Sequence, residues 1–500
     1  MNSDILGDWV VMSGSADVPQ RRIGLSADNS IYGFHEQEKF WHCDGSLLYL
    51  LDANRSVISF FEISGLPAGL LKGRVRNLSF TDSAIWLKRY QAALADMGTN
   101  DTGDLPIQVG PLETQVHDAD AFRHAWEKRE DFSVVLFPGG HVKTRPPLSA
   151  SRNLGTTPES KKFETSVNVG APNGHFFRPA FFHVLHDCLL VDGNLVATRD
   201  RRVIHETTQI AGMGPLWDTD FGLDGSVINA HQQLVKISRQ EPTLTLDMDL
   251  FLFSAVRYGY GHWLGQSVVN AVFVDWLATA APQLASSMVM AVNCGLDRES
   301  FRSDCFKLLG FKNPILPIPR GVVRVKRLIV PSFHRCHSDH WPGIGSVFRR
   351  MGENALRLRP NVPRVDRIYS SRRGQNRGFT DDAGIAAITR KHNFTEIVGG
   401  SIPYVDQVAA YAGARAVFGI FGSNMCNISF CPPEAVVMES FDELCVDPFW
   451  DFFLANAGGL NFCYLITEVD EKQRAISYHE RTTDLNPDLL DEVFSAVLPK

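Results

Sequence analysis

The chain has 500 residues, a formal net charge of -7, and 44% hydrophobic and 21% charged residues. It is longer than the about 250–300 residues at which single hydrophobic cores stop growing, so we expect several compact units. The net charge is negative, and the sequence shows no cluster of basic residues of the kind that binds nucleic acid. No run of apolar residues reaches the length of about 20 that a membrane-spanning helix needs.

The cysteine pattern and the first residues of the chain bear on the cellular compartment in which we expect the protein. Nine cysteines are spread singly with no C-x-x-C pair, which favours reduced thiols over a disulfide framework. The first residues show no basic segment followed by an apolar run, so they do not resemble a secretory signal. We therefore expect a cytoplasmic protein with, at most, peripheral membrane contact.

Residues 1–100 have the pattern of short β-strands separated by turns. Apolar runs at 40–43 and 47–51 flank Asp44-Gly45, and a further run follows at 57–61. Asp-Gly between apolar runs indicates a hairpin, because glycine accepts the positive φ of a tight turn. We predict a small antiparallel β domain here.

Residues 101–360 are predicted to form a first lobe with a β-rich entry segment. Strand-like runs lie at 133–137 and 188–198, and a polar stretch at 150–175 predicts a long loop. From about residue 246 strands and helices alternate: Leu264, Val268, Val272 and Trp276 recur on one helix face, followed by a strand at 289–293 and a helix at 302–309. This alternation is typical of a parallel α/β sheet.

Residues 361–475 repeat the α/β pattern and are predicted to form a second lobe. A strand starts at Ile368, Thr380 can cap a helix, and Pro403 begins another helix. Further strands are predicted at 394–398, 416–421 and 435–440, and residues 476–500 are predicted to form a C-terminal helix that packs back. Two such units leave a cleft at the carboxyl ends of their strands, where ligands bind.

A glycine loop and an arginine cluster are predicted to meet at that edge of the second lobe. Gly422, Ser423 and Asn424 follow a strand and precede a short helical segment, so backbone N–H groups are available to a phosphate. Arg372 and Arg377 follow the strand at Ile368, and guanidinium groups bind phosphate oxygens bidentately. An ordinary turn beside a solvated basic loop is the alternative.

Glu439 is the candidate carboxylate for the sugar part of a nucleotide. It follows the glycine loop on the next strand, where it could accept hydrogen bonds from vicinal ribose hydroxyls. A helix-capping or salt-bridged edge residue is the alternative.

Several short motifs occur in a fixed order along the chain. They are Tyr260-x-His262-Trp263-Leu264, Tyr369-x-Ser371-Arg372 with Arg377, Gln407, Ala414, Gly422, Asn427, Phe430-Cys431-Pro432-Pro433 and Glu439. This set resembles glycosyltransferase family 61 over about residues 180–465, most strongly over 366–441.

The resemblance implies an α/β fold of GT-B architecture, with two Rossmann-like lobes after the small β domain. It also implies inverting, metal-independent hexosyl or pentosyl transfer from a nucleotide-sugar, UDP-linked, to a glycan, glycolipid (surface polysaccharide) or protein acceptor, with no cofactor. The residues implied to bind the donor are Arg372, Arg377, Gly422, Ser423, Asn424, Asn427 and Glu439, and those implied to shape the cleft are Tyr260, Trp263 and Gln407.

His262 is the candidate catalytic base. Inversion requires a group that removes the acceptor proton, and the unperturbed pKa of histidine lies near working pH. The alternative is that His262 only orients the donor or caps its helix.

The glycine loop departs from the family pattern, and two other functions follow from this. Family members have a sequence like H-G-A-G-L-T-N where this chain has Phe421-Gly422-Ser423-Asn424-Met425-Cys426-Asn427. A degenerate loop would give a non-catalytic nucleotide-sugar or glycan-binding protein. Separately, the N-terminal β segment could be an interaction or glycan-binding module that docks the enzyme on a partner.

A histidine-rich segment raises the question of a metal site. His334, Cys336, His337, Asp339 and His340 lie between Pro331 and Pro342, which indicates a loop more than a helix with three ligands on one face. We expect a loop at the edge of the cleft and no bound metal.

Overall fold

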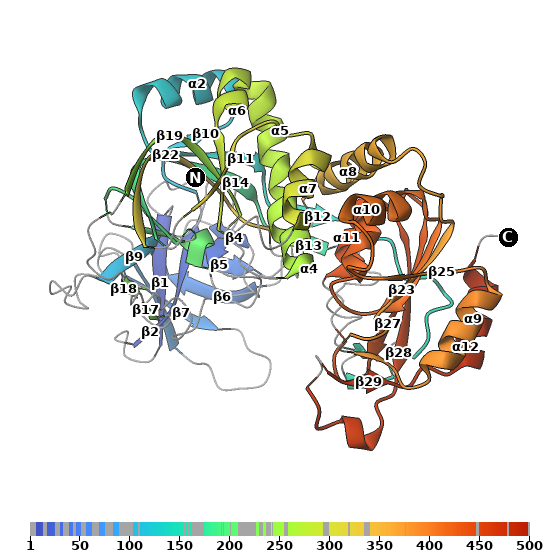
Figure 1. Cartoon of the computed structure of the whole chain (residues 1–500). Coiled ribbons are helices and arrows are strands. Elements are labelled where there is room, and N and C mark those ends of the chain that lie inside the picture. The colour runs from blue at the N-terminus through green and yellow to red at the C-terminus, as the bar shows by residue number, and fades with distance from the viewer. Residues whose placement is uncertain are drawn as a thin grey trace.

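The computed structural model describes the strands β1–β9 within residues 1–110, and most of residues 111–498. The gaps in the second part are 154–155, 159, 162–174, 192, 194, 201, 209–226, 230–233, 237–241, 243, 255–258, 294–299, 319–320, 335–340, 376, 447–449 and 478–479. The described elements form a mixed α/β structure (Figure 1).

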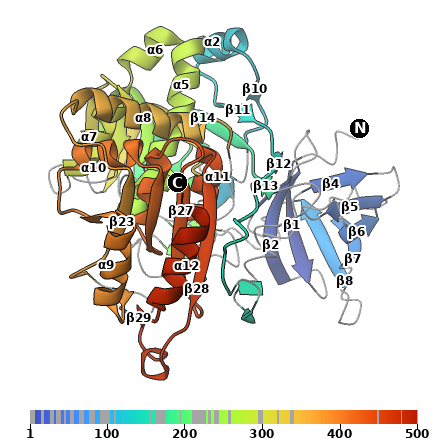
Figure 2. The same cartoon turned by 90° about the vertical axis from the view of Figure 1, so that its right-hand side faces the viewer.

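An antiparallel sheet precedes the rest of the chain and lies to one side of it (Figure 2). Strands β4 and β5 pair on either side of the predicted Asp-Gly turn, which itself lies outside the described residues. In chain order its strands are β1 (Gly7–Ser13), β2 (Val18–Leu25), β3 (Ile31–Gly33), β4 (Phe40–Cys43), β5 (Leu47–Leu51), β6 (Val57–Glu62), β7 (Leu70–Val75) and β8 (Ala84–Arg89).

A second, mixed sheet occupies the middle of the chain. Its long central strands are β14 (Ala180–Val191), β22 (Val322–Pro331) and β19 (Leu244–Ser254); β14 runs antiparallel to β22, and β19 runs parallel to it. A turn at Gly193 joins β14 to β15. The remaining strands are β9 (Asp104–Gln108), β10 (Gln115–Val116), β11 (Phe132–Phe137), β15 (Leu195–Ala197), β16 (Val203–Ile204), β17 (Val227–Asn229), β18 (Leu234–Lys236), β20 (Val289–Val292) and β21 (Ile315–Pro317).

Helices cover one side of this sheet. They are α2 (Ala119–Lys128), α5 (Ala271–Ala280), α6 (Pro282–Ser287) and α7 (Ser300–Leu309), and η3 (His205–Thr208) is a short 3₁₀ turn. A two-stranded ribbon, β12 (Gly140–Val142) with β13 (His175–Phe177), lies apart from the sheet.

The helical segment after β19 changes its winding several times before it becomes regular. It begins with α4 (Tyr260–His262), continues as the π-helical η4 (Trp263–Ser267) and the 3₁₀ η5 (Val268–Asn270), and ends in α5. Leu264, Val268 and Val272 of the predicted apolar stripe are buried, but so is every residue from 263 to 274, while Trp276 is only partly buried, so the segment is buried all round and not along one face. A π-turn inserted in a helix often accompanies a functional site, and this one directly follows His262.

The third sheet is parallel throughout, with strand order β25-β23-β26-β27-β28. Its strands are β23 (Arg367–Ser371), β25 (Thr395–Val398), β26 (Ala416–Ile420), β27 (Val436–Asp442) and β28 (Asn461–Thr467). A small ribbon of β24 (Gly378–Phe379) and β29 (Thr482–Thr483) lies beside it. Its helices are α9 (Asp382–Lys391), α10 (Tyr404–Gly413), α11 (Asp451–Gly458) and α12 (Pro487–Val497), with 3₁₀ turns η6 (Met425–Phe430) and η7 (Glu471–Gln473).

Two predicted helix starts are wrong by one position. Asp381, not Thr380, caps α9, because its carboxylate accepts a hydrogen bond from the Gly384 N–H at 2.8 Å. Pro403 is the cap of α10 and not its first residue.

The C-terminal helix α12 packs against the parallel sheet. Phe494 of α12 lies on Phe394 and Phe418, with its ring centroid 4.7 and 5.3 Å from theirs.

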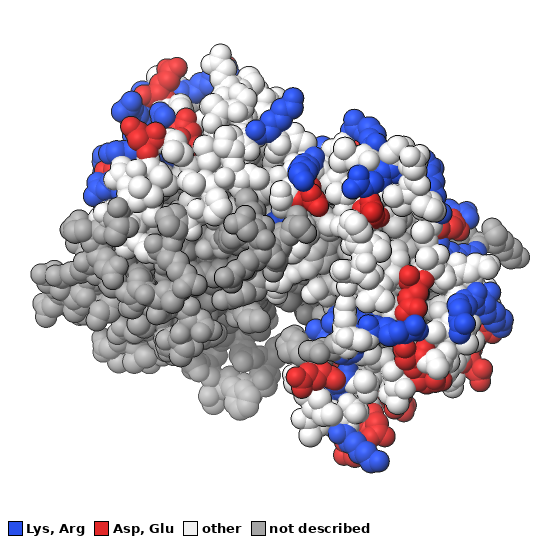
Figure 3. Space-filling view, viewed as in Figure 1, with Lys and Arg blue, Asp and Glu red and all other residues white. Residues whose placement is uncertain are grey.

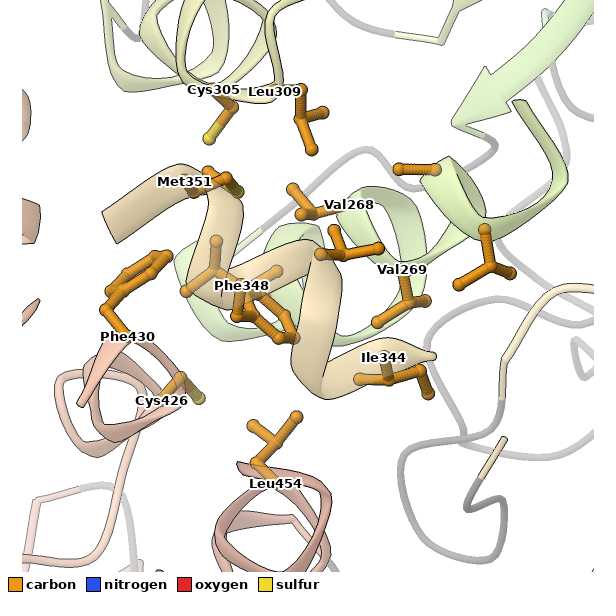
Figure 4. Close-up of a cluster of buried hydrophobic side chains, with 14 of the residues drawn as sticks. Val268, Val269, Cys305, Leu309, Ile344, Phe348, Met351, Cys426, Phe430 and Leu454 are labelled. Carbon is orange, nitrogen blue, oxygen red and sulfur yellow. The ribbon is translucent and has the colours of Figure 1, made fainter. Parts of the chain in front are cut away.

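Helix α8 (Ile344–Leu358) joins the middle sheet to the parallel sheet through one apolar core. Its Phe348 lies among side chains from both parts (Figure 4). The helix also approaches its neighbours closely, because a side chain at Gly345 would overlap the carbonyl oxygen of Ala457, and one at Gly352 would lie 2.9 Å from the Cβ of Ala412. The core residues drawn around α8 are Val268, Val269, Cys305, Leu309, Cys426, Phe430 and Leu454.

The described surface carries both signs of charge. On the face shown in Figure 3, basic and acidic side chains are interspersed over the part that holds the parallel sheet. Within the described part of the chain, no helix combines the length and apolarity needed to span a membrane.

We predict that Gly345→Ala destabilises the protein. Alanine is favoured over glycine in helices by about 1 kcal/mol, but here its methyl group would force α8 away from α11. Overpacking of this kind costs about 1–3 kcal/mol, which denaturant unfolding followed by tryptophan fluorescence would measure. The control is Glu353→Ala on the exposed face of α8, expected to stay within about 0.5 kcal/mol. Equal stability of the two variants would contradict the close helix contact.

Candidate functional site

The glycine loop follows β26 at the carboxyl edge of the parallel sheet. The Phe421 N–H donates to the Ser440 carbonyl at 2.8 Å, and the Met425 N–H donates to the Gly422 carbonyl at 2.7 Å, so both ends of the loop are fixed. Gly422 has φ 145°, a conformation that side chains rarely adopt. A Cβ there would collide with the guanidinium of Arg372 and lie 3.3 Å from Arg377 Nη1. Only glycine therefore lets both arginines reach the loop.

The structure brings Arg372 and Arg377 together, as predicted from the sequence. Arg377 has a left-handed backbone, φ 64°, and its Nη1 donates to the Phe421 carbonyl at 3.1 Å. Burial, and then the charge of Arg377, lower the pKa of Arg372 to about 10. Two guanidinium groups in one half-buried site repel each other, so an anion placed between them would be strongly favoured.

Arg373, although adjacent in sequence, has a different role. Its side chain is exposed and pairs with Asp382 at 3.1 Å and with Glu396 at 3.3 Å. Its charge is therefore balanced within the protein, and Arg372 and Arg377 are the cations that line the glycine loop.

Phe421, the departure from the family pattern, has a clear structural role here. Its ring lies 5.6 Å from the guanidinium carbon of Arg377 and stacks on Phe441 with centroids 5.1 Å apart. A cation over an aromatic face is attracted to the ring. The phenyl ring therefore supports one of the two arginines that line the glycine loop.

Asn427 connects three segments of the site. Its Oδ1 accepts hydrogen bonds from the Tyr260 hydroxyl at 2.6 Å and from Gln407 Nε2 at 2.9 Å, and its Nδ2 donates to the Asn424 carbonyl at 2.7 Å. Burial raises the pKa of the Tyr260 hydroxyl well above 10, so this group stays a donor. The amide therefore couples α4 and α10 to the glycine loop.

The helix that carries His262 touches the glycine loop directly. A Cβ at Gly261 would lie 2.9 Å from Cys426 Sγ and 3.5 Å from the Ser423 Cα, so the two backbones are in contact there. The half-buried ring of His262 meets Trp450 edge to face at 4.8 Å, and Trp450 Nε1 donates to Cys426 Sγ at 2.7 Å. His262 is thus held beside the glycine loop, whose Gly422 is in contact with Arg372.

Two candidate residues lie elsewhere than the sequence suggested. Trp263 is fully buried and packs on Phe253 at 6.2 Å, so it belongs to the core of the first part and does not line a cleft. Glu439 is also fully buried, and it lies in the middle of β27 and not at its end. Burial raises the pKa of the Tyr464 hydroxyl, and the negative charges of Glu439 and Asp451 raise it further. Glu439 does not reach the surface where a nucleoside would bind.

The other loop residues and the histidine segment are placed as follows. Ser423 is exposed at the tip of the loop, and the half-buried Asn424 donates from Nδ2 to Gln375 at 3.4 Å. His334 is buried, with its Nδ1 at 2.7 Å from the Gly265 carbonyl. The other four residues of that segment lie outside the described residues.

A pocket of about 430 Å³ opens beside the arginines, and two of its lining residues, Glu480 and Thr482, come from a segment that sequence analysis did not connect with the site. This segment was predicted to belong to the C-terminal helix, but the structure forms strand β29 at Thr482–Thr483 and begins α12 only at Pro487, so that prediction is wrong for residues 480–486. The lining of the pocket comprises Tyr369, Arg372, Arg373, Gly374, Gln375, Arg377, Gly378, Phe379, Asp382, Ile420, Glu480 and Thr482.

The geometry defines an anion site at the edge of a parallel α/β sheet, with an adjoining pocket large enough for a nucleotide. Residues 260–438 match the family model of glycosyltransferase 61. The match starts at Tyr260 and includes the two arginines and the glycine loop, and it supports a glycosyltransferase with a sugar donor and an acceptor. No curated protein matches the chain.

We predict that Asn427→Ala lowers the free energy of unfolding by about 2–4 kcal/mol, because it leaves buried donors without acceptors. Tyr260→Phe should cost about 1 kcal/mol alone, and less than about 0.5 kcal/mol in the Asn427→Ala background. Urea unfolding of the two single variants and the double variant measures this coupling. Fully additive effects would contradict the Tyr260–Asn427 hydrogen bond.

Proposed function

We propose that the protein is an inverting, metal-independent glycosyltransferase. It transfers a sugar from a nucleotide-sugar donor, UDP-linked, to a glycan or glycolipid of a surface polysaccharide or to a protein. The observation that carries the proposal is the pair Arg372 and Arg377 at the backbone of Gly422. The family match over residues 260–438 supports it.

The two guanidinium groups suit a diphosphate leaving group. As the bond between the sugar and the phosphate breaks, negative charge develops on the diphosphate, and preorganised cations in a partly buried site stabilise that charge. Arginine stays protonated at neutral pH even with a pKa lowered to about 10, as for Arg372. The pair therefore supplies two positive charges where other transferases use a divalent cation.

We assign the part ending near residue 360 and the part from residue 361 to the two lobes of a GT-B arrangement. The donor binds to the second, and His262 of the first faces the reaction centre. The acceptor oxygen attacks the anomeric carbon, the electrons of the breaking bond pass to the diphosphate, and the acceptor proton passes to the His262 imidazole. The contact of Gly261 with Ser423 supports this placement.

We further propose that the protein acts in the cytoplasm, with peripheral membrane contact where the acceptor is a glycolipid. The scattered cysteines support a reducing compartment, and those that the structure describes form no disulfide.

We predict that Arg372→Gln weakens nucleoside diphosphate binding by about 2–3 kcal/mol, or about 30- to 160-fold, since one charge-assisted interaction is lost. Calorimetry with UDP, GDP and CDP, with and without EDTA, measures this. The control is Arg373→Gln, which removes the neighbouring cation that is already paired with Asp382 and Glu396 and should change affinity less than threefold.

The same variant should be more stable without ligand. The folded-state pKa of Arg372, about 10, lies below its ordinary 12.5, so its charged form is disfavoured in the folded protein at every pH below about 10. Arg372→Gln removes this penalty and should raise the free energy of unfolding at pH 7 by on the order of 1 kcal/mol, allowing for solvent screening.

Two results of the calorimetry would contradict the proposed site. One is nucleotide binding that needs a metal, and the other is equal nucleotide affinity of the Arg372→Gln and Arg373→Gln variants.

We predict that His262→Ala lowers kcat by about 10²- to 10⁴-fold, because a general base contributes about that much. Nucleotide affinity should stay within a factor of about three. Release of nucleoside diphosphate from a panel of nucleotide-sugars, with a glycan acceptor, gives kcat. A variant that loses nucleotide affinity instead would show that His262 orients the donor.

A further inference from the structure

The pocket beside the arginines is lined by groups of different chemistry. Arg372 and Arg377, next to the glycine loop, line it together with Glu480 and Thr482, and Thr482 pairs with Gly378. The rings of Tyr369 and Phe379 stack on either side of Phe418, with centroids 5.6 and 5.9 Å away, and give the pocket a rigid aromatic floor. Its volume of about 430 Å³ is within the about 300–1,000 Å³ of small-molecule sites.

A buried ion pair holds the Glu480 wall in place. Arg481 Nη1 lies 3.1 Å from Asp442 Oδ1, both side chains are buried, and Arg481 also donates to the Ile476 carbonyl. The backbone continues into β29, where Thr482 pairs with Gly378 in parallel register.

Only Thr482 and Thr483 of this segment belong to the strand, and Glu480 lies in the turn before it, where its N–H donates to the Ser477 carbonyl at 2.9 Å. Arg481 and Thr483 line a small cavity that has Ser440 and Asp442 in its wall. Glu480 and Thr482 line the larger pocket. The buried Arg481 therefore anchors the chain directly beside Glu480.

The charges in the pocket leave one carboxylate available to a ligand. Asp382 is engaged by Arg373 at 3.1 Å and by the Tyr369 hydroxyl at 3.5 Å. Among the described residues, nothing forms an ion pair or a side-chain hydrogen bond with the exposed Glu480. The lining of the pocket thus includes two cations that suit an anion and an acceptor-only carboxylate.

We propose that this pocket binds the nucleoside of the donor and that Glu480 accepts hydrogen bonds from the vicinal ribose hydroxyls. The inference rests on the proposed function, in which Arg372 and Arg377 bind the diphosphate. It assigns to Glu480 the contact that the sequence suggested for Glu439, which is fully buried. Glu480 lies beyond residues 260–438, which the family model matches.

The pocket takes the nucleoside and not the transferred sugar because of where its walls come from. Among the described residues, those that line the pocket all lie between 369 and 482. The sugar must instead meet the acceptor and His262, next to the place where α4 contacts Ser423 of the glycine loop. A donor that spans Arg372 therefore directs its nucleoside into the pocket and its sugar towards α4.

The test is calorimetry on the full-length chain with three probes: UDP, 2′,3′-dideoxyuridine diphosphate and inorganic pyrophosphate. Glu480→Gln should weaken UDP binding at least about tenfold, because a hydrogen bond to a charged acceptor becomes a neutral one. The dideoxy probe should bind the unaltered protein about tenfold more weakly than UDP, and Glu480→Gln should not weaken it further. Pyrophosphate affinity should be unchanged. Glu471→Gln, an exposed carboxylate in η7, is the control.

Each result separates this inference from the proposed function. If Glu480→Gln binds UDP as the unaltered protein does while Arg372→Gln does not, the ribose contact is wrong and the diphosphate site stands. If Glu480→Gln weakens UDP and the dideoxy probe equally, the carboxylate acts without the ribose hydroxyls and the inference is overturned. If pyrophosphate binds but UDP binds no better, the pocket does not accept a nucleoside. If neither UDP nor pyrophosphate binds, both ideas fail.

Discussion

The site depends on the absence of a side chain at Gly422. Because this residue has no Cβ, the Arg372 guanidinium can lie directly against the backbone of the loop, with Arg377 beside it. The two cations are thereby held close together in a partly buried site. Burial and the repulsion from Arg377 disfavour the charged form of Arg372, which is why its pKa is lowered. A site that concentrates positive charge in the absence of ligand is preorganised for a dianion.

The rest of the structure holds this loop from several directions. Asn427 ties it to α4 and α10 through Tyr260 and Gln407, and Phe421 supports Arg377 through its ring. Helix α8 packs the two sheets into one core, so the segment carrying His262 is fixed relative to the loop (Figure 4). Positioning by packed elements of this kind is what a displacement reaction between two bound substrates requires.

Much of the second part could be predicted from sequence because its signals are local. Periodic apolar residues gave the strands and helices around Arg372 and Gly422, and parallel strands place such loops at one edge. The burial of Glu439 and Trp263 could not be predicted, because a strand or helix position says nothing about which neighbours cover it. The Glu480 wall was missed for a related reason: Thr482 and Thr483 pair with β24 across about 100 residues of sequence, and no local pattern encodes that contact.

The most direct test of the account is a crystal structure of the chain with a bound nucleoside diphosphate, grown with EDTA. The account predicts the diphosphate between Arg372 and Arg377 at the Gly422 backbone, without a metal ion, and with its terminal phosphate towards His262. A diphosphate bound elsewhere, or one held through a divalent cation with the arginines at a distance, would contradict it.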